Sequence, residues 1–87
     1  MNIADMQALV AVVETGSLAH AAVKLHLTQP AVTRRIQRLE ETLGLRLLDR
    51  DSKPARPTPD GRVAYAECVR VLAAADALKA IAGRRPE

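Results

Sequence analysis

Three polar side chains, Gln29, Thr33 and Arg34, stand at the start of a helix that we predict over residues 28–43. Their spacing of four and one residues brings an amide, a hydroxyl and a guanidinium onto adjoining lanes of one helical face. A Gln side chain can pair bidentately with adenine and an Arg with guanine, and each pair adds about 1–3 kcal/mol of discrimination between bases. No carboxylate precedes Glu40 in this helix. The pattern favours contact with duplex DNA, although a merely solvated helix face is the alternative.

Composition narrows the class of partner. The chain has 87 residues, which allows one small domain, and its 13 Lys and Arg against 10 Asp and Glu give a net charge of +3. Residues 45–62 carry five basic side chains against three acidic ones. Binding of single strands or RNA usually requires aromatic side chains for stacking, and the chain has one Tyr and neither Phe nor Trp. If the chain binds nucleic acid, we therefore expect duplex DNA.

Catalytic and metal-binding patterns are weak. The single cysteine, Cys68, with His20 and His26 does not make a recognisable metal site, and Ser17 and Ser52 have no base partner at triad-like positions. We therefore expect no enzyme, no cofactor and no metal. The sequence has no run of 18 apolar residues and no signal peptide. We expect a cytoplasmic protein that does not bind membranes.

The elements that position the polar face follow from caps and periodicity. Apolar spacings of three and four predict helices over residues 3–14, 18–25 and 28–43, and proline-rich residues 47–58 predict a short hairpin with a basic tip. Helix starts are expected at Asn2, Ser17, Thr28 and Thr58. The last helix, from Pro59 to about Ala82, is longer than a 60-residue globule is wide, so part of it must project. These elements predict a mainly α fold, a winged helix-turn-helix followed by a long helix.

A series of short runs also stands at fixed spacing: Leu9, Val13, Glu14, "GS" at 16–17, "AA" at 21–22, Leu25, "TQPAVTRRI" from 28, "LE" at 39–40, "LG" at 43–44, Leu47, Arg50, Thr58 and Gly61. Together these runs resemble the N-terminal DNA-binding domain of LysR-type transcriptional regulators. The resemblance covers residues 3 to about 62, and the helix that follows is similar to the family's linker helix.

The resemblance implies a bacterial regulator that binds an operator with two half-sites. It divides the chain into a winged helix-turn-helix domain at 1–58, a linker and dimerisation helix at 59–83 and a tail at 84–87. The family's C-terminal domain, which binds a small-molecule effector, is absent from this chain. The resemblance implies a homodimer and leaves a tetramer open for the full-length protein. Two alternatives stay open: a molybdate-responsive type of winged-helix regulator, and a protein-interaction or dimerisation module that does not bind DNA.

The resemblance also assigns roles to individual residues. It places the helix at 28–43 in the major groove and the wing at 47–58 on the flanking backbone or minor groove. The expected base contacts are Gln29, Pro30, Thr33 and Arg34. Arg50 matches the family's wing arginine. The other expected contacts to the backbone or minor groove follow from position and polarity: Thr28, Arg35, Gln37, Arg38, Lys53 and Arg56. The alternatives are that Thr28 is only a cap and that the hairpin cations only solubilise an edge strand. Glu40 lies about two turns away from the helix start, and we expect it to form an ion pair within the domain.

The long helix carries two apolar stripes. A narrow seam recurs at four and three, and we expect it to form the dimer interface: Ala64, Cys68, Val71, Ala75, Leu78 and Ala82. A neighbouring stripe of Tyr65, Val69 and Leu72 could return to the core of the domain. In the LysR-type family the helices of the two subunits pair antiparallel, which spaces two recognition helices for two half-sites.

Overall fold

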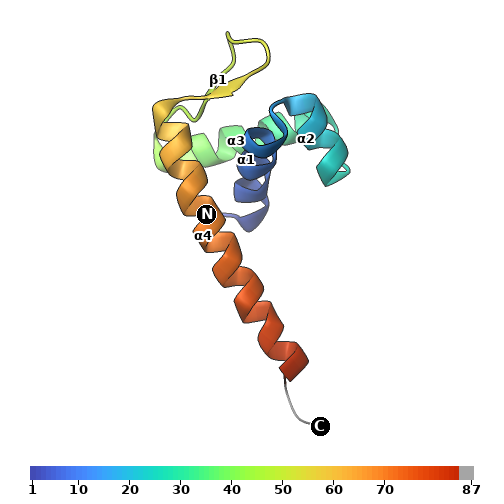
Figure 1. Cartoon of the computed structure of the whole chain (residues 1–87). Coiled ribbons are helices and arrows are strands. Elements are labelled where there is room, and N and C mark those ends of the chain that lie inside the picture. Colours follow the sequence, from blue (N-terminus) through green and yellow to red (C-terminus); the bar gives the residue numbers. More distant parts are fainter. Residues whose placement is uncertain (85–87) are drawn as a thin grey trace.

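The computed structural model describes residues 1–84, and within them helices predominate (Figure 1). The elements in chain order are α1 (Ile3–Thr15), α2 (Leu18–Leu25), α3 (Gln29–Leu43), β1 (Leu48–Asp49), β2 (Arg56–Pro57), α4 (Pro59–Ala80) and a 3₁₀ helix, η1 (Ile81–Arg84). Three helices, an antiparallel hairpin and a long helix therefore follow one another, which confirms the predicted order.

The four predicted N-caps are present. At each of them a side-chain oxygen accepts a hydrogen bond from a backbone N–H in the first turn, as at Thr28, whose Oγ1 accepts from the Ala31 N–H at 3.2 Å. The other three caps are Asn2, Ser17 and Thr58. Gly16 and Gly44 end α1 and α3 with φ of 85° and 67°, a left-handed conformation that glycine adopts without steric cost.

The core lies where α1, α2 and α3 pack together and where the start of α4 covers α1. Its largest fully buried side chains come from α1, α3 and the start of the hairpin: Leu9, Val12, Val32, Ile36, Leu39, Leu47 and Leu48. Val32, Ile36 and Leu39 are spaced at four and three, so α3 turns one apolar stripe inward. The polar side chains of α3 are left facing outward.

The hairpin joins α3 to α4. Leu48 pairs with Pro57 and Asp49 with Arg56, so the ladder is only two residue pairs long. Below it, the Thr58 N–H donates to the Leu47 carbonyl at 3.0 Å, and the Thr58 hydroxyl donates to the Arg46 carbonyl at 2.6 Å. These bonds hold both ends of the hairpin together, and the loop at 50–55 projects beyond them.

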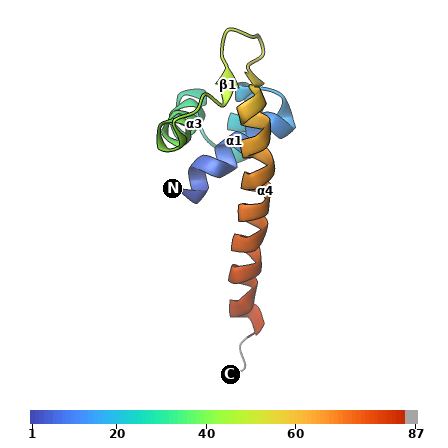
Figure 2. The same ribbon diagram turned by 90° about the vertical axis from the view of Figure 1, so that its left-hand side faces the viewer.

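α4 projects far beyond the body of the domain, as predicted from its length. The molecule measures 53 × 25 × 18 Å along its principal axes, and the hairpin loop and the free end of α4 lie at opposite ends of it (Figures 1 and 2). The α-helix ends at Ala80, earlier than predicted, because the chain tightens into the 3₁₀ helix η1 from Ile81. Gly83 lies inside η1 and does not end the α-helix. Arg84 also belongs to η1, and the remainder of the predicted tail, 85–87, lies outside the described residues.

Within residues 1–84, none of the helices combines the length and the apolar character needed to cross a bilayer. The same residues contain no group of three or more His, Cys, Asp or Glu side chains arranged to hold a metal ion.

Candidate nucleic-acid interface

The turn between α2 and α3 sets the direction of α3. His26 ends α2 in the left-handed conformation, with φ of 57°, and the Leu27 N–H donates to the Ala22 carbonyl at 2.9 Å. Thr28 then caps α3, and Pro30 lies in its first turn, where a missing N–H leaves no hydrogen bond unmade. This compact turn fixes where the first residues of α3 point.

The polar residues at the start of α3 are accessible. Gln29, Pro30 and Arg34 are exposed, and Thr33 is half-buried at the edge of the same face. The opposite face of the helix carries the buried stripe, so burial of the apolar side chains turns the amide and guanidinium groups outward. Gln29 and Arg34 are therefore free to reach an external partner.

A shallow hollow of about 400 Å³ joins the start of α3 to the hairpin loop. Its lining residues come from the first turn of α2, the first turn of α3 and the loop: Leu18, Ala19, Gln29, Arg50, Ser52, Lys53, Pro54 and Ala55. Gln29 and Lys53 are 24 residues apart in the sequence, and both were predicted to contact DNA. The fold places them on one surface. A partner seated against Gln29 also meets the ammonium group of Lys53.

Glu40 links α3 to the hairpin. Its Oε2 accepts hydrogen bonds from the N–H groups of Leu47 at 2.8 Å and Leu48 at 3.3 Å. Its Oε1 accepts from Arg50 Nη2 at 3.0 Å. The ion pair predicted for Glu40 is confirmed, and it holds the base of the wing at a fixed position relative to α3.

The same ion pair revises the role expected for Arg50. The Arg50 side chain is only 28% exposed, and its Nε is buried without a hydrogen-bond partner among residues 1–84. Its Nη2 is directed inward and donates to the Glu40 carboxylate, whose charge it balances in a partly buried position. Arg50 is therefore a positioning residue for the wing, and the outer surface of the loop is left to Lys53.

The pKa of the Glu40 carboxyl is lower than its ordinary value of 4.5. Partial burial acts to raise this pKa, but the Arg50 hydrogen bond, the two backbone N–H groups and the positive charge of Arg50 together outweigh burial. Since the pKa is lowered in the folded state, the ionised carboxylate stabilises the fold. That stabilisation is complete above 4.5 and is lost as the pH falls through the lowered folded-state pKa.

We expect Glu40→Gln to lower the free energy of unfolding by about 1–2 kcal/mol at neutral pH, because it removes charge-assisted hydrogen bonds. In urea titrations at successively lower pH, the difference between wild type and variant should narrow as the wild-type carboxyl becomes protonated. Glu67→Gln is the control, since Glu67 is an exposed carboxylate on α4. A difference between wild type and Glu40→Gln that stayed constant with pH would contradict this role.

Arg38 also has a carboxylate partner within the domain. Its Nη2 donates to Asp5 Oδ1 at 2.9 Å, and the Asp5 side chain is only 7% exposed. The contact joins α3 to the first turn of α1 and neutralises a buried carboxylate. Arg38 thus forms an ion pair within the domain, while half of its side chain stays exposed, so its contact with the DNA backbone remains a prediction.

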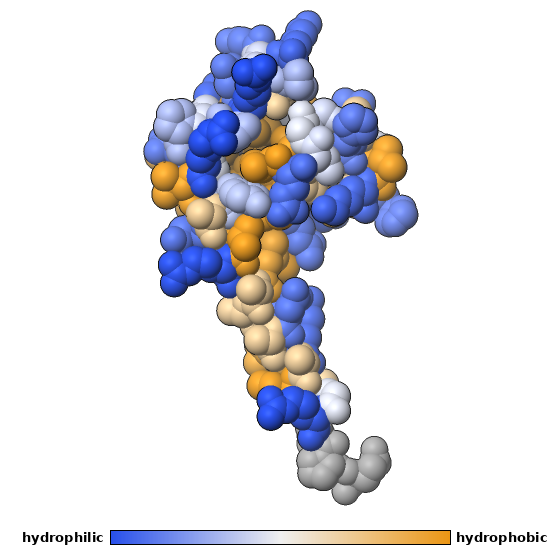
Figure 3. All heavy atoms as spheres, in the orientation of Figure 1, coloured by the Kyte–Doolittle hydropathy of each residue, from blue (hydrophilic) through white to orange (hydrophobic). Residues whose placement is uncertain are grey.

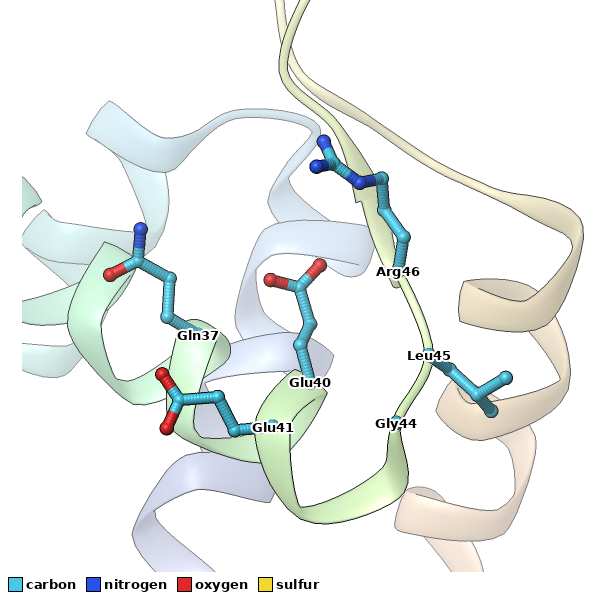
Figure 4. Close-up of a pocket in the computed structure, with 6 residues that line it drawn as sticks. All are labelled: Gln37, Glu40, Glu41, Gly44, Leu45 and Arg46. Carbon is cyan, nitrogen blue, oxygen red and sulfur yellow. The ribbon is translucent and has the colours of Figure 1, made fainter.

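The other predicted backbone contacts lie on or near the surface. Thr28, Gln37, Lys53 and Arg56 are exposed, and Arg35 is half-buried. Sequence reasoning overlooked Arg46, an exposed cation that lines a second hollow together with Gln37, Glu40, Glu41, Gly44 and Leu45. Figure 4 shows Arg46 extending over the side of α3 that carries Gln37, whereas Leu45 points away from it. The sequence could have indicated Arg46 by its positive charge and by its position immediately before the hairpin.

The first half of the predicted dimer seam lies inside the domain. Cys68 is 6% exposed and Ala64 packs against the core, because the first turns of α4 lie on α1. Burial also raises the pKa of the Cys68 thiol. Leu72, from the neighbouring stripe, packs against the same core, as predicted. The prediction that Ala64 and Cys68 form dimer contacts is therefore wrong, because both pack within the domain.

The second half of the seam remains accessible. Val71 is 41% exposed and Leu78 is 69% exposed, and Ala75 and Ala82 lie on the same projecting stretch. In the space-filling view, apolar surface follows this stretch of α4 with hydrophilic side chains beside it, whereas hydrophilic side chains dominate the hairpin (Figure 3). An apolar stripe on a helix that projects into solvent is typical of an interface.

Comparison with known proteins relates the chain to helix-turn-helix regulators. Residues 3–62 match the model of a family described as bacterial regulatory helix-turn-helix proteins, lysR family. The chain is 39% identical over 84 residues to the HTH-type transcriptional regulator BenM of Acinetobacter baylyi, covering 97% of this chain and 28% of BenM. It is 46% identical over 72 residues to an uncharacterised HTH-type transcriptional regulator of Azotobacter vinelandii, covering 83% of this chain and 50% of that protein. The chain thus spans half or less of the length of these curated relatives.

A solved structure shares the fold. The crystal structure of a BenM_DBD complex with catB site 1 DNA superposes with a TM-score of 0.89 at 39% identity, covering 97% of this chain and 93% of that one. The agreement includes the three helices, the hairpin and the long last helix, so the predicted fold class is confirmed.

Proposed function

The chain belongs to the lysR family of bacterial regulatory helix-turn-helix proteins, and on this premise we propose that residues 1–58 bind double-stranded DNA in a sequence-specific manner. The observation that carries the proposal is the exposed polar start of α3, where Gln29, Pro30 and Arg34 are accessible and Gln29 lines the same hollow as Lys53. An α-helix with this polar end fits the major groove, where base edges present distinct patterns of donors and acceptors. The match to a BenM_DBD complex with DNA supports this assignment.

We propose that different side chains of this interface contact the bases and the DNA backbone. Gln29, Pro30, Thr33 and Arg34 contact base edges, and contacts to phosphates or the minor groove come from Thr28, Arg35, Gln37, Arg38, Arg46, Lys53 and Arg56. Phosphate contacts supply most of the affinity and make it salt-dependent, whereas base contacts supply the preference among sites. Arg50 acts indirectly, because its guanidinium group holds Glu40, and Arg38 also holds Asp5.

Selection of bound duplexes from a random-sequence pool tests the proposed function. The wild-type chain should enrich one short motif, in two copies related by dyad symmetry if a dimer binds. Recovery of duplexes with no shared motif would contradict sequence-specific binding.

We propose that residues 59–83 form a linker helix through which two copies of the chain pair in an antiparallel manner. The accessible seam consists of Val71, Ala75, Leu78 and Ala82, and its two alanines permit close approach of two helices. We place the activity in the bacterial cytoplasm, with the protein on the nucleoid when bound to DNA.

We expect the chain to sediment as a dimer at micromolar concentrations and Leu78→Glu to shift it toward monomer. The introduced carboxylate would lie in the seam, where its burial against a second apolar helix is unfavourable. Val23→Glu is the matched control, since Val23 is an apolar residue of similar exposure on α2, away from the seam. A wild-type chain that sedimented only as a monomer would contradict pairing through α4.

A further inference from the structure

One polar contact joins the long helix to the helical body. Tyr65, in the second turn of α4, donates from its hydroxyl to Glu14 Oε2 at 2.9 Å. Glu14 lies in the last turn of α1, and its Oε1 is 3.6 Å from Lys24 Nζ in the last turn of α2. Within residues 1–84, no other side-chain hydrogen bond or ion pair joins the α4 helix to α1, α2 or α3. Three helices thus meet at a single carboxylate.

Beyond its first turn, where Gly61 lies against the Leu47 carbonyl, α4 contacts the body mainly through apolar side chains. Ala64, Cys68 and Leu72 recur every four residues and form one line of side chains against the core. Apolar contacts are non-directional, so they alone do not select one angle between α4 and the body. Tyr65 is adjacent to Ala64, and its hydrogen bond to Glu14 adds a directional contact.

The hydrogen bond between Tyr65 and Glu14 requires a protonated Tyr65 hydroxyl. The hydrogen bond to Glu14 raises the pKa of the Tyr65 hydroxyl, so the hydroxyl keeps its proton and remains a donor. Lys24 Nζ lies 3.6 Å from the other carboxylate oxygen of Glu14. A hydrogen bond to an ionised group is stronger than one between neutral groups.

The direction of α4 matters for two-site binding. Two copies paired through their α4 helices hold their α3 helices at a distance that depends on the angle between α4 and the body of each copy. We propose that the Glu14–Tyr65 hydrogen bond fixes this angle and thereby restricts the spacing of half-sites that the dimer accepts. Glu14 and Tyr65 are positioning residues in this scheme and need not touch DNA. The inference rests on the proposed function, and its test separates the two.

The test uses the whole chain and duplexes that carry two inverted copies of the motif recovered by selection. Their spacing increases in steps of one base pair over about one helical turn of 10 base pairs, and a duplex with a single copy is measured alongside. Wild type should show one preferred spacing. Tyr65→Phe, which keeps the ring and removes only the hydroxyl, should reduce the preference over neighbouring spacings by roughly threefold to tenfold. Its affinity for the single-copy duplex should stay within about twofold of wild type, since contacts to one half-site do not involve Tyr65.

Glu14→Ala and the double variant complete the experiment. Both should broaden the spacing profile at least as much as Tyr65→Phe, because all three remove the Glu14–Tyr65 hydrogen bond, and the double variant should broaden it no further than Glu14→Ala. Glu67→Gln is the control on the same helix, since the carboxylate of Glu67 pairs with Arg70 of α4 itself, and it should leave the profile unchanged. An unaltered profile in Tyr65→Phe would overturn the inference, and so would an equal loss on the single-copy duplex. Failure of the wild type to prefer any duplex would instead overturn the proposed function.

Discussion

Gly61→Ala should lower the free energy of unfolding by about 3 kcal/mol or more. Gly61 is buried in the first turn of α4, and a Cβ built on it would overlap the carbonyl oxygen of Leu47. That oxygen belongs to the backbone and accepts the Thr58 N–H at 3.0 Å, so it cannot rotate away as a side chain could. Relief of the overlap requires α4 to move off the base of the hairpin, which would also expose Leu47 and Leu48.

Chemical denaturation followed by circular dichroism measures this effect. Gly83→Ala is the matched control, because a Cβ at Gly83 meets nothing within 4 Å and its φ is not positive, and its effect should be near zero. Gly16→Ala should fall between the two, at about 1 kcal/mol, because the strain comes only from the positive φ. Equal stability of Gly61→Ala and wild type would show that the close approach of α4 to the hairpin is wrong.

Arg34→Ala should reduce the preference for the selected duplex over a scrambled one by roughly tenfold to a hundredfold. Arg34 is exposed one turn into α3, on the face that also presents Gln29 and Pro30. The guanidinium can donate two parallel hydrogen bonds to a guanine edge, which alanine cannot replace. The affinity for scrambled DNA should change much less, since it depends on the remaining phosphate contacts.

Lys53→Ala is the comparison for Arg34→Ala. Lys53 lies on the hairpin loop, and as a phosphate contact it should contribute equally to every sequence. Its removal should weaken selected and scrambled duplexes alike and reduce the slope of log affinity against log salt by about one. If both variants acted equally on the two duplexes, then base readout by α3 would be contradicted.

The features that were predictable from the sequence are those set by neighbouring residues. Caps at Asn2, Ser17, Thr28 and Thr58 depend on contacts two or three residues along the chain, and all four were correct. The outward position of Gln29 and Arg34 also followed, because helical periodicity fixes which side is opposite the buried stripe. Periodicity therefore located the candidate interface before any tertiary contact was known.

Partners distant in the sequence were not predictable. Arg38 and Arg50 looked like cations available to DNA, but each had a carboxylate partner that only the packing of α3 on α1 and on the hairpin reveals. The spacing of Ala64 and Cys68 correctly indicated an apolar seam, yet it did not tell whether the domain or a second copy covers it. In each case the periodicity of the sequence indicated which face of the helix a residue lies on. The residue that it contacts is determined by the tertiary packing.

We propose that the exposed start of α3 discriminates among base sequences, and competition binding at moderate ionic strength measures this discrimination. A labelled selected duplex bound to the wild-type chain is challenged with unlabelled duplexes of selected or scrambled sequence. We predict that the selected competitor displaces the label at a concentration about a thousandfold lower than the scrambled one. Displacement by both at the same concentration would contradict the claim.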